Sequence, residues 1–508
     1  MSTPAPIFNL SLMAPEICLF LWACLVFTYD IVTKRKSETA VAWLAMAGPV
    51  VTGLLALGMF YAGSYGYGKA AGTMFQVDPM ALFFKMIFLG AAFLAIGSSF
   101  GYLKERIQNH RGEFFGLVLL STVGMMFLSA SNEMISLYIG LELTTIPLFV
   151  LAAFFKDDKL SVEAGVKYLI VGAFSSALLL YGLSFLFGLS GTTDLLQMKV
   201  NIAITQLKLE SIGVILILAI LTMLAGLGFK LALPPFHQWA PDVYQGAPTP
   251  VAAFLSVGSK AAGLVAFAKI MIYGLSAFFE PMMRPNDWGQ LTALLAAAAM
   301  IVGNVVAVRQ TNFKRMLAYS SIAQAGYIMV GMLAMNQYGL SSVAYYMFAY
   351  MFANMGVFAV VAMVENKTGS CEISSYAGLS RTSPFAALAL TIFLLSLIGI
   401  PPLAGFMSKY YVFAAAIDMA GTASSFGWIY WLVGVGLVTS VVALYYYANV
   451  IRQMYFAPEP ASYTVPLTVP MAIVITAGLA GVILFGLFPE SVLAFARNIP
   501  MSYGFIPR

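Results

Sequence analysis

A lysine, a proline pair and a histidine follow one another within eight residues of the stretch GFKLALPPFHQW. Lys230 comes directly after the nearly pure hydrocarbon run SIGVILILAILTMLAGLGF, and Pro234, Pro235 and His237 come next. A proline pair removes backbone donors and breaks a helix. Imidazole titrates near neutrality and passes protons in both directions, and a lysine in apolar surroundings gives up its proton more readily than an exposed one. These residue types at this spacing therefore indicate proton transfer, although a lone histidine is also compatible with a purely structural role.

A second stretch, SLIGIPPLAGFMSKYYVF, repeats the combination of a proline pair and a lysine. Pro401 and Pro402 interrupt the hydrocarbon, and Lys409 follows seven residues after the second proline. In a membrane, the carbonyl groups freed by such a break must face protein or water. The two stretches predict two broken helices with a lysine beside each break. Two unrelated proline kinks are the simpler alternative.

Two more ionisable residues lie deep in apolar runs. Lys260 in VAAFLSVGSKAAGLVAF is at least twelve residues from either end of its run, and Glu142 in ISLYIGLELTTIPLFVL is the only acid that we place deep in any run. A charged group at the centre of a transmembrane helix costs about 2.5–3.5 kcal/mol on insertion scales, so such residues are functional by default. We predict that both take part in the chemistry.

Three further lysines have a simpler explanation. Lys85 and Lys269 lie about two turns from the end of a run, where a long side chain can extend to the membrane surface. Lys167 lies four residues after Glu163, which predicts an ion pair at the membrane boundary. From their own context, a structural role accounts for these three lysines, and a functional role stays open as the alternative.

The elements that must position these residues are transmembrane helices. The chain has 508 residues, of which 61% are hydrophobic and 9% charged, whereas a soluble domain carries about 25% charged residues. Runs of about twenty apolar residues are long enough to cross the hydrocarbon core. We expect an all-α polytopic protein with about fourteen spans, at residues 9–31, 39–61, 78–102, 113–131, 134–155, 162–190, 211–234, 248–274, 288–308, 316–335, 341–364, 384–417, 428–452 and 467–489.

Basic residues are distributed unevenly between the two sets of loops. Fourteen of the 26 lysines and arginines lie in loops after odd-numbered spans, among them Arg35, Lys156 and Lys314, and six lie in the opposite set, among them Lys69 and Arg497. The positive-inside rule then places the odd loops in the cytoplasm and both termini on the other side.

The two proline-broken spans, the seventh and the twelfth, are five spans apart. An odd offset reverses orientation, so spans 4–8 and 9–13 form an inverted pair of five-helix bundles, an arrangement found in many transporters. We therefore predict four regions: three N-terminal helices at 1–112, a first repeat at 113–275, a second repeat at 288–453, and a C-terminal helix and tail at 454–508.

Several chemistries are not supported by the sequence. The three cysteines (Cys18, Cys24 and Cys371) form no CxxC motif or Cys/His cluster. YGYGKAAG misses the GxGxxG spacing and follows no strand, and no phosphate-binding loop motif is present. We therefore expect neither a metal nor a redox cofactor in this chain.

The stretch LPPFHQWAPDVYQGAPTPVAAFLSVGSKAAG resembles subunit N of the proton-pumping NADH–quinone oxidoreductase, respiratory complex I, including its counterparts in photosynthetic lineages. NFKRMLAYSSIAQAGYIMVG and LLSLIGIPPLAGFMSKYYVF resemble the same family, and the resemblance extends over essentially the whole chain. It implies fourteen helices, the inverted repeat, and a proton path of charged residues at mid-membrane. The residues that it assigns to this path are Glu142, Lys167, Lys230, His237, Lys260 and Lys409. For Lys167, it favours a functional role over the ion pair alone.

The resemblance also implies partners and a location. The partners would be a sister antiporter-like subunit, the small membrane subunits of complex I, and lipids, with no nucleic acid. Quinone, flavin and Fe–S clusters would belong to partner subunits. The expected location is a bacterial cytoplasmic membrane or a thylakoid-type membrane.

Two other functions stay open at this point. One is a subunit of a multisubunit sodium/proton antiporter, whose sequences share the H-x-W-x-P-D core. The other is a passive membrane scaffold in which the buried charges only fix helix packing.

Overall fold

The structure, a computed structural model, describes residues 10–33, 38–61, 74–107, 110–208, 212–275, 287–334, 336–422, 427–457, 461 and 463–499. Arg35 and Lys69, two of the loop residues used above for orientation, lie outside the described residues.

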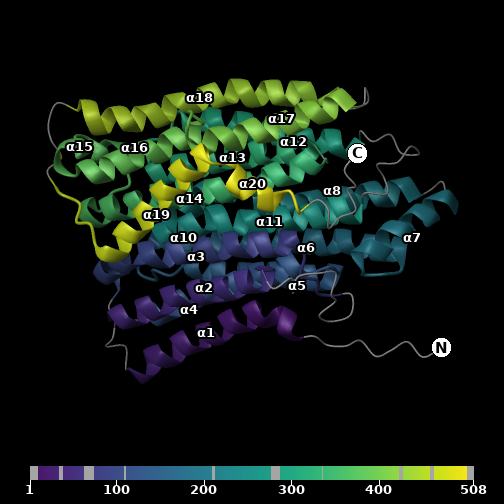
Figure 1. Cartoon of the computed structure of the whole chain (residues 1–508), viewed down its shortest axis with the longest axis horizontal. Helices are drawn as coiled ribbons and strands as arrows, with labels where there is room; N and C mark the ends of the chain where they lie inside the picture. The colour runs from purple at the N-terminus through teal and green to yellow at the C-terminus, as the bar shows by residue number, and fades with distance from the viewer. Residues whose placement is uncertain are drawn as a thin grey trace.

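The described part of the chain is helical, and its only β pairing is three isolated bridges, Phe75–Ser131, Glu133–Asp194 and Asn312–Glu372. Figure 1 shows most helices running side by side along the longest axis of the molecule. The helices are α1 (Ala14–Val32), α2 (Glu38–Tyr61), α3 (Pro79–Arg106), α4 (Arg111–Ala130), α5 (Met134–Ala152), α6 (Lys159–Ser190), α7 (Leu195–Lys208), α8 (Ile212–Leu231), α9 (Trp239–Gly246), α10 (Thr249–Phe254), α11 (Lys260–Phe267), α12 (Asp287–Ala307), α13 (Phe313–Ala334), α14 (Gln337–Thr368), α15 (Leu379–Thr382), α16 (Pro384–Ile398), α17 (Ala404–Thr422), α18 (Ile429–Phe456), α19 (Val469–Leu487) and α20 (Glu490–Ala496), with short 3₁₀ turns at η1 (Leu10–Met13) and η5 (Ile373–Tyr376).

The predicted membrane spans are confirmed by this architecture. Among the described residues, thirteen helices are long and apolar enough to cross a membrane. The remaining predicted span, 384–417, corresponds to α16, of 15 residues, and the first part of α17, which the second break separates. The chain is therefore a multi-pass membrane protein. The prediction missed α7, a helix of 14 residues between α6 and α8, because that segment is too short and too polar to register as a span.

Two helical breaks lie at the predicted proline pairs. Helix α8 ends at Leu231 and is followed by Ala232 in the left-handed region (φ 55°), while α16 ends at Ile398 and is followed by Gly399 (φ 92°). A residue of this conformation commonly ends a helix. The peptide bonds Pro234–Pro235 and Pro401–Pro402 are both cis. The prediction of two broken helices is confirmed, whereas the division into four regions and two repeats stays a prediction.

One continuous rod at the centre of the molecule changes its helical form twice. Residues Thr249–Gly274 run through α10, a π-helical turn η2 (Leu255–Ser259), α11, and a second π-helical segment η3 (Ala268–Gly274). All residues of this rod except Tyr273 are buried, and in Figure 1 it lies between α3 and α14. Insertions of π-helix are rare and occur frequently at functional sites. Lys260 begins the α-helical turn that follows the first of them.

Candidate functional site

Lys230 lies in the last turn of α8, directly before the first break, and is only 7% exposed. Its ammonium group donates a hydrogen bond to the hydroxyl of Thr145 on α5. The carbonyl of Phe229, in the last turn of α8, accepts a hydrogen bond of 3.1 Å from the Trp239 indole in addition to one of 3.0 Å from the Ala232 N–H. The break is therefore stabilised by α9, and Lys230 is held by a neutral acceptor.

Glu142 lies on α5 one turn before Thr145 and is half-buried. Its carboxylate accepts a hydrogen bond from the hydroxyl of Ser176 on α6. Glu142 and Lys230 are close enough for their charges to interact, but within the described residues they form no direct ion pair. A rearrangement of α5 would change the surroundings of both groups, because α5 carries Glu142 and the hydroxyl that binds Lys230.

Lys260 is 3% exposed and connects the rod to α13. Its ammonium group donates to the backbone carbonyl of Ser321. One turn farther along, a Cβ atom at Gly263 would lie only 3.1 Å from the Cβ of Lys230. The glycine therefore allows α8 to approach the rod closely, which brings Lys230 and Lys260 onto neighbouring turns of adjacent helices.

A row of polar side chains on α13 continues from Lys260. Ser320, Ser321, Gln324 and Tyr327 recur at three- and four-residue spacing, so they share one face of the helix. All four are buried. Their partners come from α9, α14, α16 and α18. The Ser321 hydroxyl lies 3.4 Å from the Tyr244 hydroxyl, and the Ser320 hydroxyl is hydrogen-bonded to the Tyr447 hydroxyl. Gln324 accepts a hydrogen bond from Tyr346 and donates one of 3.2 Å to the Leu397 carbonyl, and Tyr327 donates one of 3.2 Å to Thr439.

Lys409 lies at the far end of this row and is 7% exposed. Its ammonium group donates to the Ile398 carbonyl at 2.8 Å and to the Ser440 hydroxyl at 3.2 Å, and it lies 4.6 Å from the centre of the Tyr327 ring. Ile398 is the last residue of α16, so Lys409 binds a carbonyl that the second break has freed. The α13 row thus extends from Lys260 to Lys409.

A small cavity of about 10 Å³ lies between the row and the second break. Its polar lining comes from Gln324, Tyr346, Tyr350, Ser396 and Ser408. A cavity of roughly 10–15 Å³ with two or more polar partners is the minimum for one water molecule. The lining therefore suits a single water beside Gln324.

Sequence reasoning missed the α13 row. The stretch SSIAQAGY carries polar residues at helical spacing inside an apolar run, and this periodicity was the available signal. Serines and a glutamine are common in membrane helices, so the pattern does not by itself identify a path.

His237 lies in the loop of the first break and is half-buried. Its Nδ1 atom is buried and has no hydrogen-bond partner among the described residues. No hydrogen bond joins its ring to Lys230 or Lys260 in that part of the chain. The structure therefore places His237 in the loop of the first break without connecting it directly to either lysine.

Lys167 lies apart from the other predicted site residues, on the first half of α6. Its ammonium group contacts Glu163 at 2.6 Å and Asp242 at 2.6 Å, and its side chain is 41% exposed. Asp242 also pairs with Arg315 at 2.6 Å. The predicted Glu163 pair is present, and Asp242 of the HQWAPD segment joins it to the beginning of α13.

Lys85 and Lys269 do not extend to the membrane surface, so that expectation is wrong. Lys85 is fully buried and pairs with Glu16 at 2.7 Å, and Lys269 is 2% exposed and donates to the Ser131 carbonyl at 2.5 Å. Both acceptors lie far away in the sequence, and a lysine with an internal acceptor has no need to reach the surface.

Glu142 is also not the only acid buried among the helices. Glu16 is 4% exposed and Glu365 7% exposed, whereas Glu142 is half-buried. Glu365 was overlooked because α14 continues to Thr368, four residues beyond the predicted end of its span.

Glu365 is the centre of a second polar cluster at one end of the molecule. Its carboxylate accepts hydrogen bonds from Tyr102 at 3.3 Å and from Thr249, and pairs with Arg106 at 3.2 Å and Lys314 at 3.6 Å. Burial raises the pKa of the neighbouring Cys371 thiol to about 12. The cluster connects α3, α10, α13 and α14 beside a hollow of about 280 Å³.

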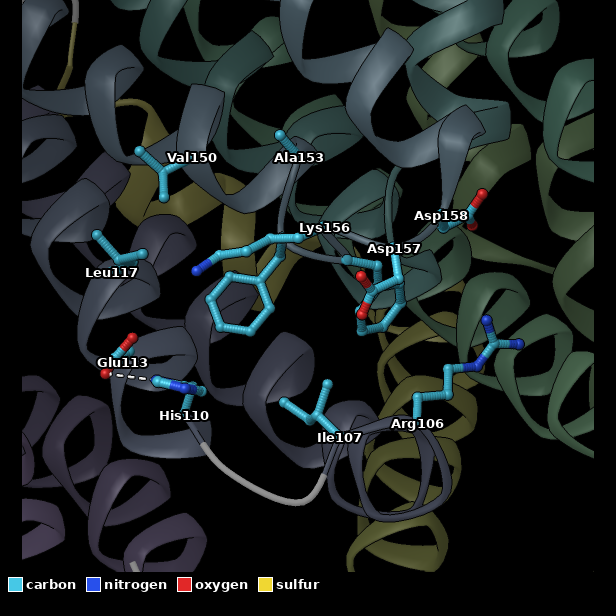
Figure 2. A pocket seen from close by; sticks show the side chains of 12 residues that line it. Arg106, Ile107, His110, Glu113, Leu117, Val150, Ala153, Lys156, Asp157 and Asp158 are labelled. Atoms are coloured by element: carbon cyan, nitrogen blue, oxygen red, sulfur yellow. Dashed lines mark hydrogen bonds and ion pairs between the residues drawn. The ribbon is translucent and has the colours of Figure 1, made fainter.

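A larger hollow of about 690 Å³ lies between the beginning of α4 and the α5–α6 connection. Figure 2 shows His110 paired with Glu113, at 2.8 Å, and Arg106 directed away from them. None of the predicted site residues lines this hollow, so it is separate from the candidate site. No group of three or more metal-ligating side chains occurs within the described ranges.

Comparisons with known proteins agree with one another. Residues 131–443 match the family described as "NADH:quinone oxidoreductase/Mrp antiporter, TM". The chain is 39% identical to NADH-quinone oxidoreductase subunit N of Trichlorobacter lovleyi over 96% of both chains. It is 40% identical to NAD(P)H-quinone oxidoreductase subunit 2 of Synechocystis, over 89% of this chain and 83% of that one. A chain of respiratory complex I from Thermus thermophilus superimposes with a TM-score of 0.76 at 30% identity, covering 95% of this chain and 99% of that chain.

Proposed function

We propose that the chain moves protons across the membrane as a subunit of a quinone-reducing complex I. This proposal starts from its family, because the chain belongs to the subunit N branch of the NADH:quinone oxidoreductase/Mrp antiporter family. Electron transfer takes place in partner subunits, which carry the flavin, the Fe–S clusters and the quinone site. Other membrane subunits of that complex are its partners.

The observation that best supports this function is the buried polar row between Lys260 and Lys409. An isolated lysine inside a membrane protein is costly, and here two such lysines lie at the two ends of one continuous polar face. A scaffold needs neither an uninterrupted row of hydroxyl and amide groups nor a water-sized cavity beside it. A proton path needs both.

In the proposed order, protons enter from the cytoplasmic side near the first break and reach Lys230. They pass to Lys260 on the adjacent turn, then along Ser321, Gln324 and the neighbouring water site to Lys409, and leave on the opposite side. His237 delivers protons at the break, and Glu142 adjusts the charge on Lys230. Lys167 belongs to the uptake side, where Asp242 holds it.

The chain resides in a bacterial cytoplasmic membrane or a thylakoid-type membrane, with both termini on the non-cytoplasmic side. This orientation is supported by the unequal distribution of lysine and arginine between the two sets of loops. It sets the direction of the path, because the cytoplasm is the side of proton uptake.

The test uses the whole complex in vesicles and compares Lys260→Met with Lys156→Met. Lys156 is exposed in the α5–α6 connection and lies outside the path, so its variant is the matched control. We expect Lys260→Met to assemble but to lose most proton pumping, and Lys156→Met to pump normally. An assembled Lys260→Met complex that pumps at the wild-type rate would make the chain a scaffold.

A further inference from the structure

Four other charged residues form a buried set that lies outside both the path from Glu142 to Lys409 and the Glu365 cluster. Glu16, Asp78, Lys85 and Lys269 are between 0% and 7% exposed. Glu16 is the third residue of α1, Asp78 caps the beginning of α3, and Lys269 lies in the final segment of the central rod, η3. Under the proposed orientation, all of them lie toward the non-cytoplasmic side.

The Glu16–Lys85 pair is unusual in its lack of further support. The ammonium nitrogen lies 2.7 Å from Glu16 Oε1. Neither Lys85 Nζ nor either Glu16 oxygen has a well-aligned hydrogen bond within the described part of the chain. A buried ion pair repays its desolvation only when its remaining donors and acceptors are satisfied. Beyond its own contact, the pair therefore has none of the further hydrogen bonds that would fix both charges in place.

The two lysines meet at one short backbone bridge. Phe75 and Ser131 form an isolated β-bridge. The Lys85 ammonium lies 5.5 Å from the centre of the Phe75 ring, and Lys269 donates to the Ser131 carbonyl at 2.5 Å. Lys269 interacts electrostatically with both Lys85 and Asp78. Lys85 and Lys269 are thus the cations of one cluster.

The same rod connects this cluster to the central lysine. Lys260 and Lys269 are nine residues apart along it, a rise of about 14 Å at 1.5 Å per residue. Lys269 lies within π-helical η3 and Lys260 directly follows π-helical η2. Both lysines on the rod therefore accompany an irregularity of the helix.

We propose that Lys269, Lys85 and Glu16 form a second proton exit, which leads from Lys260 to the non-cytoplasmic side through the N-terminal helices rather than through Lys409. This inference rests on the proposed proton-transfer function. In one cycle, Lys85 gives its proton to the Glu16 carboxylate, which leaves an amine and a carboxylic acid. Glu16 then releases that proton to the outside, and the Lys85 amine takes a proton from the Lys269 ammonium. One proton is moved, and the ion pair returns to its first state once Lys269 has been reprotonated from Lys260.

A static ion pair that fastens α1 to α3 is the alternative. Arginine separates the two, because it keeps the pair with Glu16 but does not release its proton. The decisive variant is therefore Lys85→Arg in the whole complex. A second variant, Glu16→Gln with Lys85→Met, removes both charges together, which a static pair tolerates far better than the loss of one partner. The exposed pair Glu490–Arg497 supplies the control, Glu490→Gln with Arg497→Met.

Proton release is measured in vesicles, relative to quinone reduction, for each assembled complex. We expect Lys85→Arg and the neutral pair to lower the ratio of protons to electrons by at least a quarter, while the control keeps the wild-type ratio. A wild-type ratio in Lys85→Arg, or in the neutral pair if the arginine variant does not assemble, overturns the second exit. The Lys260→Met complex is measured in parallel. If it also pumps protons at the wild-type ratio, the proposed function itself is wrong. If it loses pumping while the Lys85→Arg complex keeps the wild-type ratio, only the second exit is rejected.

Discussion

Residue by residue, the buried lysines of this protein fall into two kinds. Lys230, Lys260 and Lys409 are held by hydroxyl and carbonyl oxygens, whereas Lys85 and Lys314 contact carboxylates. A lysine held by neutral acceptors can change its charge without leaving a partner carboxylate unpaired. We infer that the first kind can carry protons singly, whereas Lys85 exchanges its proton with its partner Glu16. The difference was invisible in the sequence, which shows Lys85 as well as Lys230, Lys260 and Lys409 as a cation in an apolar run.

At this scale, we predict that Glu142 and Lys230 act as one coupled step. Helix α5 carries both Glu142 and the Thr145 hydroxyl that binds Lys230. An ionic interaction at an effective dielectric near 20 is worth about 4 kcal/mol at 4 Å, so a change in their separation alters how readily Lys230 gives up its proton. Glu142→Gln and Lys230→Ala should each lose most of the pumping, and the double variant should be little worse than either. Pumping rates of the four assembled complexes form the cycle, and additive losses would show two independent groups.

Among the elements, α13 and the rod 249–274 determine how the site is built. Both were predicted as spans from hydropathy, and both proline breaks were predicted from the helix-breaking chemistry of proline. The π-helical turns and the polar face of α13 were not predicted, because both depend on which residues of other helices face each turn. Pairs such as Glu16 and Lys85 join residues 69 positions apart, a contact that no local pattern encodes.

At the scale of helices, we predict that proton pumping depends on the polar face of α13. Gln324 connects it to α14 through Tyr346 and to the end of α16 through Leu397. Gln324→Leu removes both bonds and leaves the buried Tyr346 hydroxyl without its acceptor, at a cost of about 1–3 kcal/mol. We expect pumping to fall severalfold in an assembled complex. Gln310→Leu, three residues beyond the end of α12, is the control, and equal pumping in the two variants would remove Gln324 from the path.

For the molecule as a whole, the sequence predicted the membrane class, the number of spans and the two broken helices, because hydropathy and proline chemistry act locally. It overstated the isolation of Glu142 and placed Lys85 and Lys269 at the surface. The two lysines were misplaced because the partners that bury them come from segments distant in the sequence, whereas Glu365 was missed because α14 extends beyond the predicted end of its span.

The orientation of the whole chain is tested by labelling single cysteines in a background without the three native ones. Lys156 and Arg309 are exposed in loops predicted to be cytoplasmic, and Asn498 is exposed near the C-terminal end. Impermeant reagents should label cysteines at 156 and 309 only from the cytoplasmic side, and one at 498 only from the other. Lys314, although in a basic loop segment, is unsuitable because it is buried. The opposite labelling pattern would reverse the direction of the path.

The central claim is that Lys260 carries a proton rather than a permanent charge, and replacement by arginine tests it most directly. Lys260→Arg keeps a cation beside the Ser321 carbonyl, but arginine does not release its proton. Proton pumping by the assembled complex should be lost in Lys260→Arg to the same extent as in Lys260→Ala. Full pumping in the arginine variant, together with loss in the alanine variant, would show that Lys260 serves as a fixed counter-charge and would contradict the account.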